Sequence, residues 1–276
     1  MSDPRDSDVL FNIGVIKLDK FDDKQSAFEQ FEKALSFDPD HLLALFNSAV
    51  LLQESGDAKY RSTAEERLKR VLAVKENKDR KKSVLSSDPP DEKIYFNLGM
   101  LAMDAKNDVE AEALFRKAIE IKPDFRSALF NLALMLTSSA EARVSKSAVV
   151  GRGGAATSAA DASKTAFEPA VKASADLLEH HPNHVKGLIL MGDLQINRIK
   201  NLTHAEFCFS RAFELDSKND QALHNLCVVY VERGELERAK ECLERVLRMV
   251  PGETYVRRHL EIVMSRITKR KKMTGA

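Results

Sequence analysis

The sequence predicts an all-α protein: a solenoid of about six helix pairs followed by a capping helix at its C-terminal end. Two observations lead to this prediction. A short motif recurs along the chain, and each copy is followed by small and bulky residues at helical spacing. In addition, Gly and Pro number only 11 and 8 in 276 residues and Trp is absent, which argues against a sheet-rich fold with many turns.

The motif has five residues: a bulky residue, a second bulky residue that is usually Phe, an asparagine, an apolar residue and a small residue. Its copies, of which the fifth is degenerate, begin at Leu10, Leu45, Tyr95, Leu129, Leu188 and Leu223. After the third copy, a small-bulky-small series ends at a proline: Ala111, Phe115, Ala118 and Pro123. Small residues let paired helices approach closely, and proline ends the second helix because it lacks an N–H. No pair can bury its apolar face alone, so stacking makes the core.

The small residues that end the motifs divide the chain into repeats of unequal length. Their spacings are 35, 50, 34, 59 and 35 residues, so two steps contain insertions. The first insertion is a charged linker, and the second is an Ala/Ser/Gly-rich insert at 138–163 whose low complexity predicts disorder. We expect repeats one and two at 1–74, the charged linker at 75–93 and repeats three to six with the insert at 94–252. A capping helix at 253–268 and a basic tail at 269–276 follow.

The composition argues against several classes of function. Lys and Arg number 43 and Asp and Glu number 42, so the net charge of +1 gives no general attraction to nucleic acid or to an anionic membrane. The longest apolar run, 42–52, is too short to cross a bilayer. No apolar stretch of a secretory signal follows Met1. If the chain is complete as written, we therefore expect it in the cytoplasm.

The cysteines and histidines suggest no chemistry by their spacing. Cys208, Cys227 and Cys242 fall within apolar helical patterns, so we expect buried, inert thiols rather than a disulfide framework. Cys208 and Cys242 occupy equivalent positions of successive repeats, ~8–10 Å apart at helix packing distance and beyond disulfide reach. The histidines at 180–184 lie where one repeat ends and the next begins, which favours exposed turn residues over metal ligands.

No enzyme motif is present. The sequence lacks the His-Glu-x-x-His, Gly-x-Ser-x-Gly and Cys-x-x-Cys patterns. The glycines at 151–154 lack the Lys-Ser/Thr and the preceding strand of a phosphate loop. We expect no catalytic residue, no metal ligand and no cofactor in this chain.

The third motif copy resembles the tetratricopeptide repeat (TPR), a 34-residue helix pair. The sixth copy also matches without a gap, with Val246 at a position where the family usually has Ala. The resemblance implies a right-handed superhelix in which the first helix of each pair lines a concave groove. Repeat positions 5 and 6 would then supply its candidate peptide-binding residues: Phe11, Phe46, Phe96 and Phe130, and Asn12, Asn47, Asn97, Asn131 and Asn225.

An asparagine side chain carries a donor and an acceptor, so a ladder of amides can hold the backbone of an extended polypeptide. A second interpretation stays open, in which these residues serve only the architecture of the repeat. The pattern argues against the TPR type that clamps a terminal carboxylate, because most repeats lack its Lys at position 5 and Asn at position 9.

Runs at 224–230, 239–243 and 255–260 resemble the transmembrane and TPR repeat-containing (TMTC) proteins, over about the C-terminal two-thirds of the chain. The resemblance implies a protein O-mannosyltransferase of the endoplasmic reticulum that uses dolichyl phosphate mannose and acts on cadherin-type proteins. Its lumenal repeats would bind the substrate or a partner protein. The multipass domain of that family, with its catalytic residues, is not part of this sequence.

Two functions therefore stay open. The first is the lumenal, partner-binding part of a TMTC-like transferase, for which Asn201 of the sequon Asn201-Leu202-Thr203 becomes a candidate glycosylation site. The second is a free cytosolic TPR scaffold that assembles other proteins.

Overall fold

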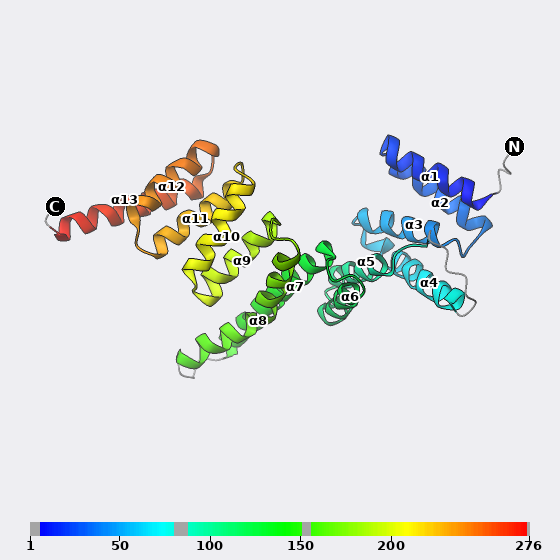
Figure 1. The fold of residues 1–276 in the computed structure, drawn as a ribbon, viewed down its shortest axis with the longest axis horizontal. Coiled ribbons are helices and arrows are strands. Elements are labelled where there is room, and N and C mark those ends of the chain that lie inside the picture. Colours follow the sequence, from blue (N-terminus) through cyan, green and yellow to red (C-terminus); the bar gives the residue numbers. More distant parts are fainter. Residues whose placement is uncertain (1–5, 80–87, 151–155, 275–276) are drawn as a thin grey trace. The chain divides into compact units, whose positions relative to one another are not determined.

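The computed structural model describes residues 6–79, 88–150 and 156–274. Within these ranges the chain is helical and has no strand, which confirms the all-α prediction (Figure 1). The chain divides into two compact units, Met1–Ala128 and Leu129–Ala276, and the core of each is described separately below.

The first unit contains three consecutive helix pairs and the start of the next helix. Its helices are α1 (Ser7–Phe21), α2 (Lys24–Phe37), α3 (Leu42–Glu54), the short 3₁₀ helix η1 (Ala58–Tyr60), α4 (Arg61–Asp79), α5 (Asp91–Asp104) and α6 (Asp108–Ile121). Helix α1 packs on α2, α3 on α4, and α5 on α6, while α3 also contacts α5. Each pair is therefore a helical hairpin, and successive hairpins stack mainly through the second helix of one and the first helix of the next, α2 on α3 and α4 on α5.

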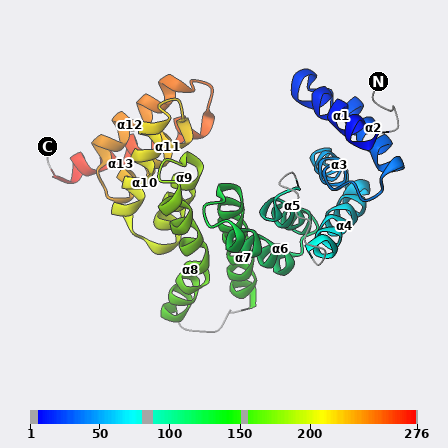
Figure 2. The same cartoon turned by 45° about the vertical axis from the view of Figure 1, so that its right-hand side comes forward.

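The second unit continues the same pattern and ends in a single helix. Its helices are α7 (Arg126–Val150), α8 (Ala156–His180), α9 (Val185–Leu194), the π-helical segment η2 (Gln195–Ile199), α10 (Leu202–Leu215), α11 (Asp220–Glu232), α12 (Leu236–Met249) and α13 (Thr254–Thr274). Helices α9 and α10 pack together, as do α11 and α12, and α13 packs on α12 (Figure 2). The buried Val256 and Val263 join α13 to the core of this unit, as expected for a capping helix.

Close approach within a hairpin depends on the small residue that ends each motif. A Cβ atom built on Gly99 would lie 2.8 Å from the ring of Phe115, and one on Gly192 would lie 2.5 Å from the ring of Phe209. Both distances are below van der Waals contact, so at these two positions only glycine lets the ring approach the first helix this closely. Phe115 and Phe209 are fully buried in consequence.

The fifth repeat accommodates one extra residue as a π-helical turn. Helix α9 passes directly into η2, and Lys200 ends the segment in the left-handed region at φ 65°. The backbone N–H of Asn201 donates to the carbonyl of Gln195 at 2.9 Å, which closes the widened turn. Single π turns of this kind commonly mark an inserted residue within a helix.

The Ala/Ser/Gly-rich insert differs from expectation. Helix α7 continues to Val150 and α8 begins at Ala156, so the described residues of 138–163 are helical rather than disordered. Residues 151–155 lie outside the described residues. Alanine is the strongest helix former, and Ala140 is also buried, so composition that lacks aromatics still forms helix here.

The two predicted charged segments are also more helical than expected. Helix α4 extends into the linker as far as Asp79, and α5 begins at Asp91, while residues 80–87 lie outside the described residues. Lys75 donates to the carbonyl of Pro89 at 2.6 Å and pairs with Asp91, which joins the two ends of the linker. Helix α13 continues through the predicted tail to Thr274, because Lys and Arg favour helix and suit its C-terminal end.

The prediction of three inert thiols is wrong. Cys227 and Cys242 form a disulfide, with their Cα atoms 5.4 Å apart. The comparison between equivalent positions of successive repeats missed this pair, because Cys227 on α11 faces Cys242 on α12 within one hairpin. Cys208 remains a free, buried cysteine, and burial raises the pKa of its thiol to about 12, so it is unreactive.

Candidate functional site

Two of the three position-6 asparagines of the first unit make the same kind of bond. Asn47 Nδ2 donates to the carbonyl of Leu43 at 2.8 Å, and Asn97 Nδ2 donates to the carbonyl of Lys93 at 2.8 Å. Each bond reaches one turn back along its own helix and fixes the amide. The oxygen Oδ1 and the second N–H of each amide have no hydrogen-bond partner in the described part of the chain. Asn12 lies exposed at the same position of α1.

In the second unit, the corresponding amide links two successive first helices. Asn225 Nδ2 on α11 donates to Asp193 Oδ1 on α9 at 2.9 Å. Burial raises the pKa of the Asp193 carboxyl to about 6. Asn131 on α7 is half-buried at the same repeat position. Sequence reasoning named Asn225 but missed the role of Asp193, which occupies position 9 where other repeats have apolar residues.

The position-5 phenylalanines are packing residues by their contacts. The ring of Phe11 lies 5.5 Å from that of Phe31 and 5.2 Å from the ring of His41. Phe96 lies 5.9 Å from Phe115 in the same way. The remaining two rings are half-buried, Phe46 against a core cluster and Phe130 at 5.1 Å from His184. Contact between these rings and a bound peptide stays a prediction.

Within the histidine cluster at the turn before α9, His184 has a structural role as a helix cap. Its Nδ1 accepts from the backbone N–H of Gly187 at 3.0 Å and so caps α9. His41 caps α3 in the same manner, through Ala44 N–H at 3.2 Å. His184 does lie in the turn, but it is half-buried and caps a helix, so the prediction that it is exposed is wrong. Among the described residues, no group of three or more His, Cys, Asp or Glu side chains could hold a metal ion.

His224, at position 5 of the sixth repeat, pairs with His259 on α13. His224 Nε2 and His259 Nδ1 lie 3.0 Å apart, and the two rings stack with centroids separated by 5.1 Å. The ring of Tyr255 meets His224 edge-on at 5.0 Å. Burial, followed by the neighbouring His259, lowers the pKa of His224. The substitution of His for the usual Phe was the available sequence signal, but its partner on α13 could not be inferred from spacing.

A small pocket lies beside this pair, between α11, α12 and α13. Its volume is about 190 Å³, and its apolar lining comes from Val228, Val231, Leu243, Ile262 and Val263. The polar lining residues are Glu232, His259 and Arg266. Val228 occupies position 9 of the sixth repeat.

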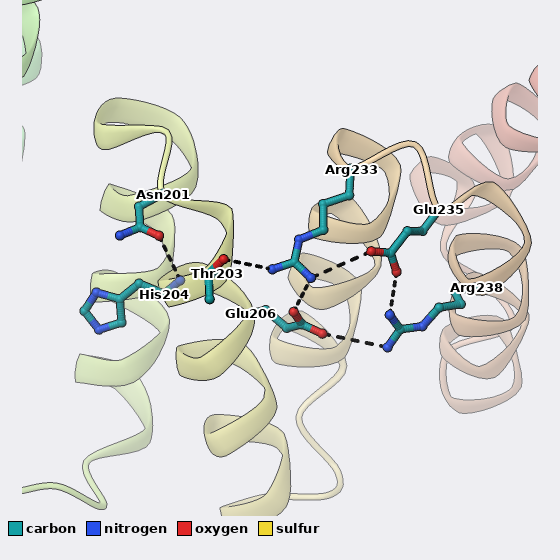
Figure 3. Close-up of polar contacts among 7 residues, drawn as sticks. All are labelled: Asn201, Thr203, His204, Glu206, Arg233, Glu235 and Arg238. Atoms are coloured by element: carbon teal, nitrogen blue, oxygen red, sulfur yellow. Dashed lines mark hydrogen bonds and ion pairs between the residues drawn. The ribbon is translucent and has the colours of Figure 1, made fainter.

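The candidate glycosylation site lies at the start of α10 (Figure 3). Asn201 is the exposed N-cap, and its Oδ1 accepts from the backbone N–H of His204 at 3.1 Å. The hydroxyl of Thr203 accepts from Arg233 Nη2 at 3.4 Å. Arg233 also pairs with Glu206 on α10 and, at 3.8 Å, with Glu235.

Comparison with known sequences agrees with these repeats. The tetratricopeptide-repeat profile matches residues 7–41, 92–125 and 220–251. The human protein O-mannosyl-transferase TMTC3 is 39% identical over 267 residues, covering 96% of this chain. Its Drosophila melanogaster counterpart Tmtc3 is 46% identical over 190 residues, covering 69%.

This is a tetratricopeptide-repeat chain related to the TMTC3 proteins. The likeness to human TMTC3 extends beyond the C-terminal two-thirds that sequence analysis had identified, since it covers the first two TPR repeats as well. The chain spans 25% of the length of human TMTC3 and 18% of that of the Drosophila protein. No helix in the described ranges is long and apolar enough to cross a membrane.

Solved structures support the TPR fold. The type IV pilus biogenesis factor PilW matches with a TM-score of 0.62 at 17% identity, over 92% of this chain and 98% of PilW. Pseudomonas aeruginosa pilF gives 0.60 at 18% identity, over 92% and 96% of the two chains. YrrB, described as a TPR protein with an unusual peptide-binding site, gives 0.50 at 15% identity, over 80% and 91%. At these identities the likeness establishes the fold alone.

Proposed function

We propose that this chain is the partner-binding part of a TMTC-like protein O-mannosyltransferase and that its TPR repeats hold extended polypeptide segments in the lumen of the endoplasmic reticulum. In this proposal, sugar transfer from dolichyl phosphate mannose belongs to the part of the relatives that this chain does not cover. The similarity to TMTC3 proteins supports the family assignment, and the position-6 amides support the binding role.

The proposed binding role rests on the hydrogen bonding of the Asn47 and Asn97 side-chain amides. Their helices, α3 and α5, contact each other, and each amide is fixed by a bond to its own helix. Each still offers one N–H and one carbonyl oxygen, which is the complement of a peptide backbone. Because the amides are already ordered, a ligand would lose less side-chain entropy on binding.

The disulfide supports the lumenal placement. Disulfides persist in oxidising compartments such as the lumen of the endoplasmic reticulum and are rare in the cytosol. Cys227 and Cys242 are joined within the hairpin of α11 and α12. A cytosolic scaffold would keep these two cysteines reduced.

A binding titration tests the proposal. The ligand is an extended peptide taken from a Ser/Thr-rich strand of a cadherin-type extracellular domain. We expect the double variant Asn47→Ala, Asn97→Ala to weaken binding by at least tenfold, since up to four hydrogen bonds of about 0.5–1.5 kcal/mol each are lost. Asn77→Ala, an identical change at an exposed site on the second helix α4, serves as the matched control. Unchanged affinity with a lower melting temperature would show that the amides serve only the architecture.

Protease protection tests the compartment. In microsomes from cells that make the full-length natural protein, these repeats should resist added protease until detergent opens the vesicles. Digestion without detergent would place the repeats in the cytosol and favour the scaffold alternative.

A further inference from the structure

We propose that Asn201 carries an N-linked glycan that is added before the fifth repeat folds. The proposal rests on the lumenal placement argued above. Asn201-Leu202-Thr203 is the single Asn-x-Ser/Thr sequence among the 276 residues, so the chain offers one such acceptor. In the transfer, Asn201 Nδ2 loses a proton and bonds to C1 of the sugar of a dolichyl-pyrophosphate oligosaccharide, and the dolichyl pyrophosphate leaves.

The folded geometry is compatible with the product. Asn201 uses its Oδ1 to cap α10, through the N–H of His204 at 3.1 Å. Its Nδ2 has no hydrogen-bond partner in the ranges that the structure describes, and the residue is exposed. A glycan attaches through Nδ2 and leaves Oδ1 in place, so the cap and the glycan can coexist. Neither Asn201 nor Thr203 lines the pocket between α11 and α13.

The folded geometry is not compatible with the transfer itself. The transferase must bind the acceptor amide and the Thr203 hydroxyl together in an extended segment. In the fold, Asn201 is the N-cap of α10, Thr203 lies in its first turn, and the Thr203 hydroxyl accepts from Arg233 instead (Figure 3). Arg233 is held in turn by Glu206 and Glu235. The sequon is therefore available before α10 forms and packs, and unavailable afterwards.

Expression in a secretory cell tests the modification. Residues 1–276, directed to the lumen by a cleavable signal, should run as a single glycosylated band that peptide N-glycosidase shifts down by one step. Asn201→Asp should abolish the shift while keeping an N-cap oxygen, and Thr203→Ser should retain it. A chain whose signal has been cleaved but whose band does not shift would overturn the proposal. That result would leave protease protection, and hence the proposed function, standing.

A reconstituted reaction tests the order of events. The purified, folded chain made without glycan is compared with a peptide of residues 195–210, each given the transferase and the lipid-linked oligosaccharide. We expect the peptide to be modified at least tenfold faster. Equal rates would overturn the claim that folding closes the site, whatever the result in cells.

Discussion

Asn225 on α11 donates a hydrogen bond of 2.9 Å to the carboxylate of Asp193 on α9 and so joins the first helices of two successive repeats. In the described part of the chain, Asp193 has no ion-pair partner, and burial raises its pKa from 3.8 to about 6. A half-buried carboxylate next to a neutral amide is costly when ionised, because desolvation is not compensated by a cation.

We therefore predict that Asp193→Asn stabilises the fold at neutral pH. A raised carboxyl pKa means that the folded state holds its proton more tightly, so stability falls as pH rises from about 4 to 6. Above pH 6 the penalty is on the order of 1–3 kcal/mol, discounted for partial solvent exposure. Urea unfolding at pH 7.4 and 4.5 measures it. A variant that is less stable at pH 7.4 would show that the charged carboxylate is favourable.

The opposite pH dependence is expected from His224. Its lowered pKa keeps the imidazole neutral in the fold, so stability is present above about pH 6.5 and is lost as pH falls. His259 and Tyr255 face the ring from α13, while Asp220 and Asn225 lie on its own helix. Four other repeats have Phe at this position, and the variant His224→Phe should not lose this stability as pH falls.

Hydrogen exchange of α13 amides at pH 7.5 and 5.5 provides the measurement for this histidine. In the unmodified chain, α13 should exchange faster at pH 5.5, after correction for the intrinsic rate, because protonation weakens its contact with α11. In the variant the two corrected rates should agree. A pH effect that persists undiminished would exclude the histidine pair as its source.

Gly192→Ala should destabilise the second unit by about 1–3 kcal/mol, because the added Cβ would lie 2.5 Å from the buried Phe209 ring. Alanine's better helix propensity offsets about 1 kcal/mol of the clash at most. The matched control is Gly252→Ala, where the new Cβ meets nothing within 4 Å. The denaturant midpoint should move for the first variant alone. Similar midpoints in both would show that the ring can shift freely.

Removal of the disulfide should lower stability by about 2–4 kcal/mol, since its loss releases a cross-link over 15 residues of the unfolded chain. Cys227→Ala keeps a small residue at the hairpin contact and isolates the effect of the cross-link. In the oxidised, denatured chain, an alkylating reagent should label Cys208 alone. Labelling of all three cysteines without a reductant would contradict the pairing.

Most of the fold could be predicted from the sequence because the repeat is defined by small and bulky residues at regular spacing. Gly99 packs against the ring of Phe115, which lies sixteen positions later. In the fifth repeat the offset is seventeen, from Gly192 to Phe209. Such pairs lie within one hairpin and can be identified from spacing. The helices at the ends of the Ala-rich insert were not predicted, because its low complexity indicates disorder whereas its alanines favour helix.

The candidate site was less predictable, since its contacts join separate helices. Asn225 was identifiable as a repeated amide, whereas its partner Asp193 lies 32 residues away and breaks the apolar pattern. The pairing of His224 with His259 depends on how α13 is rotated, which no local pattern specifies. The pairing of Cys227 with Cys242 was missed although both lie in one hairpin, because buried free thiols would suit the same apolar pattern.

The π-helical turn at Gln195–Ile199 shows what keeps neighbouring repeats in phase. An additional amino acid is taken up as a local bulge, while Gly192 on one side and Ala205 on the other remain buried against their partners. The packing of successive repeats is thus maintained by contacts between side chains and does not require a constant repeat length. Drift in repeat length during evolution can accumulate at such turns without disturbing the stack.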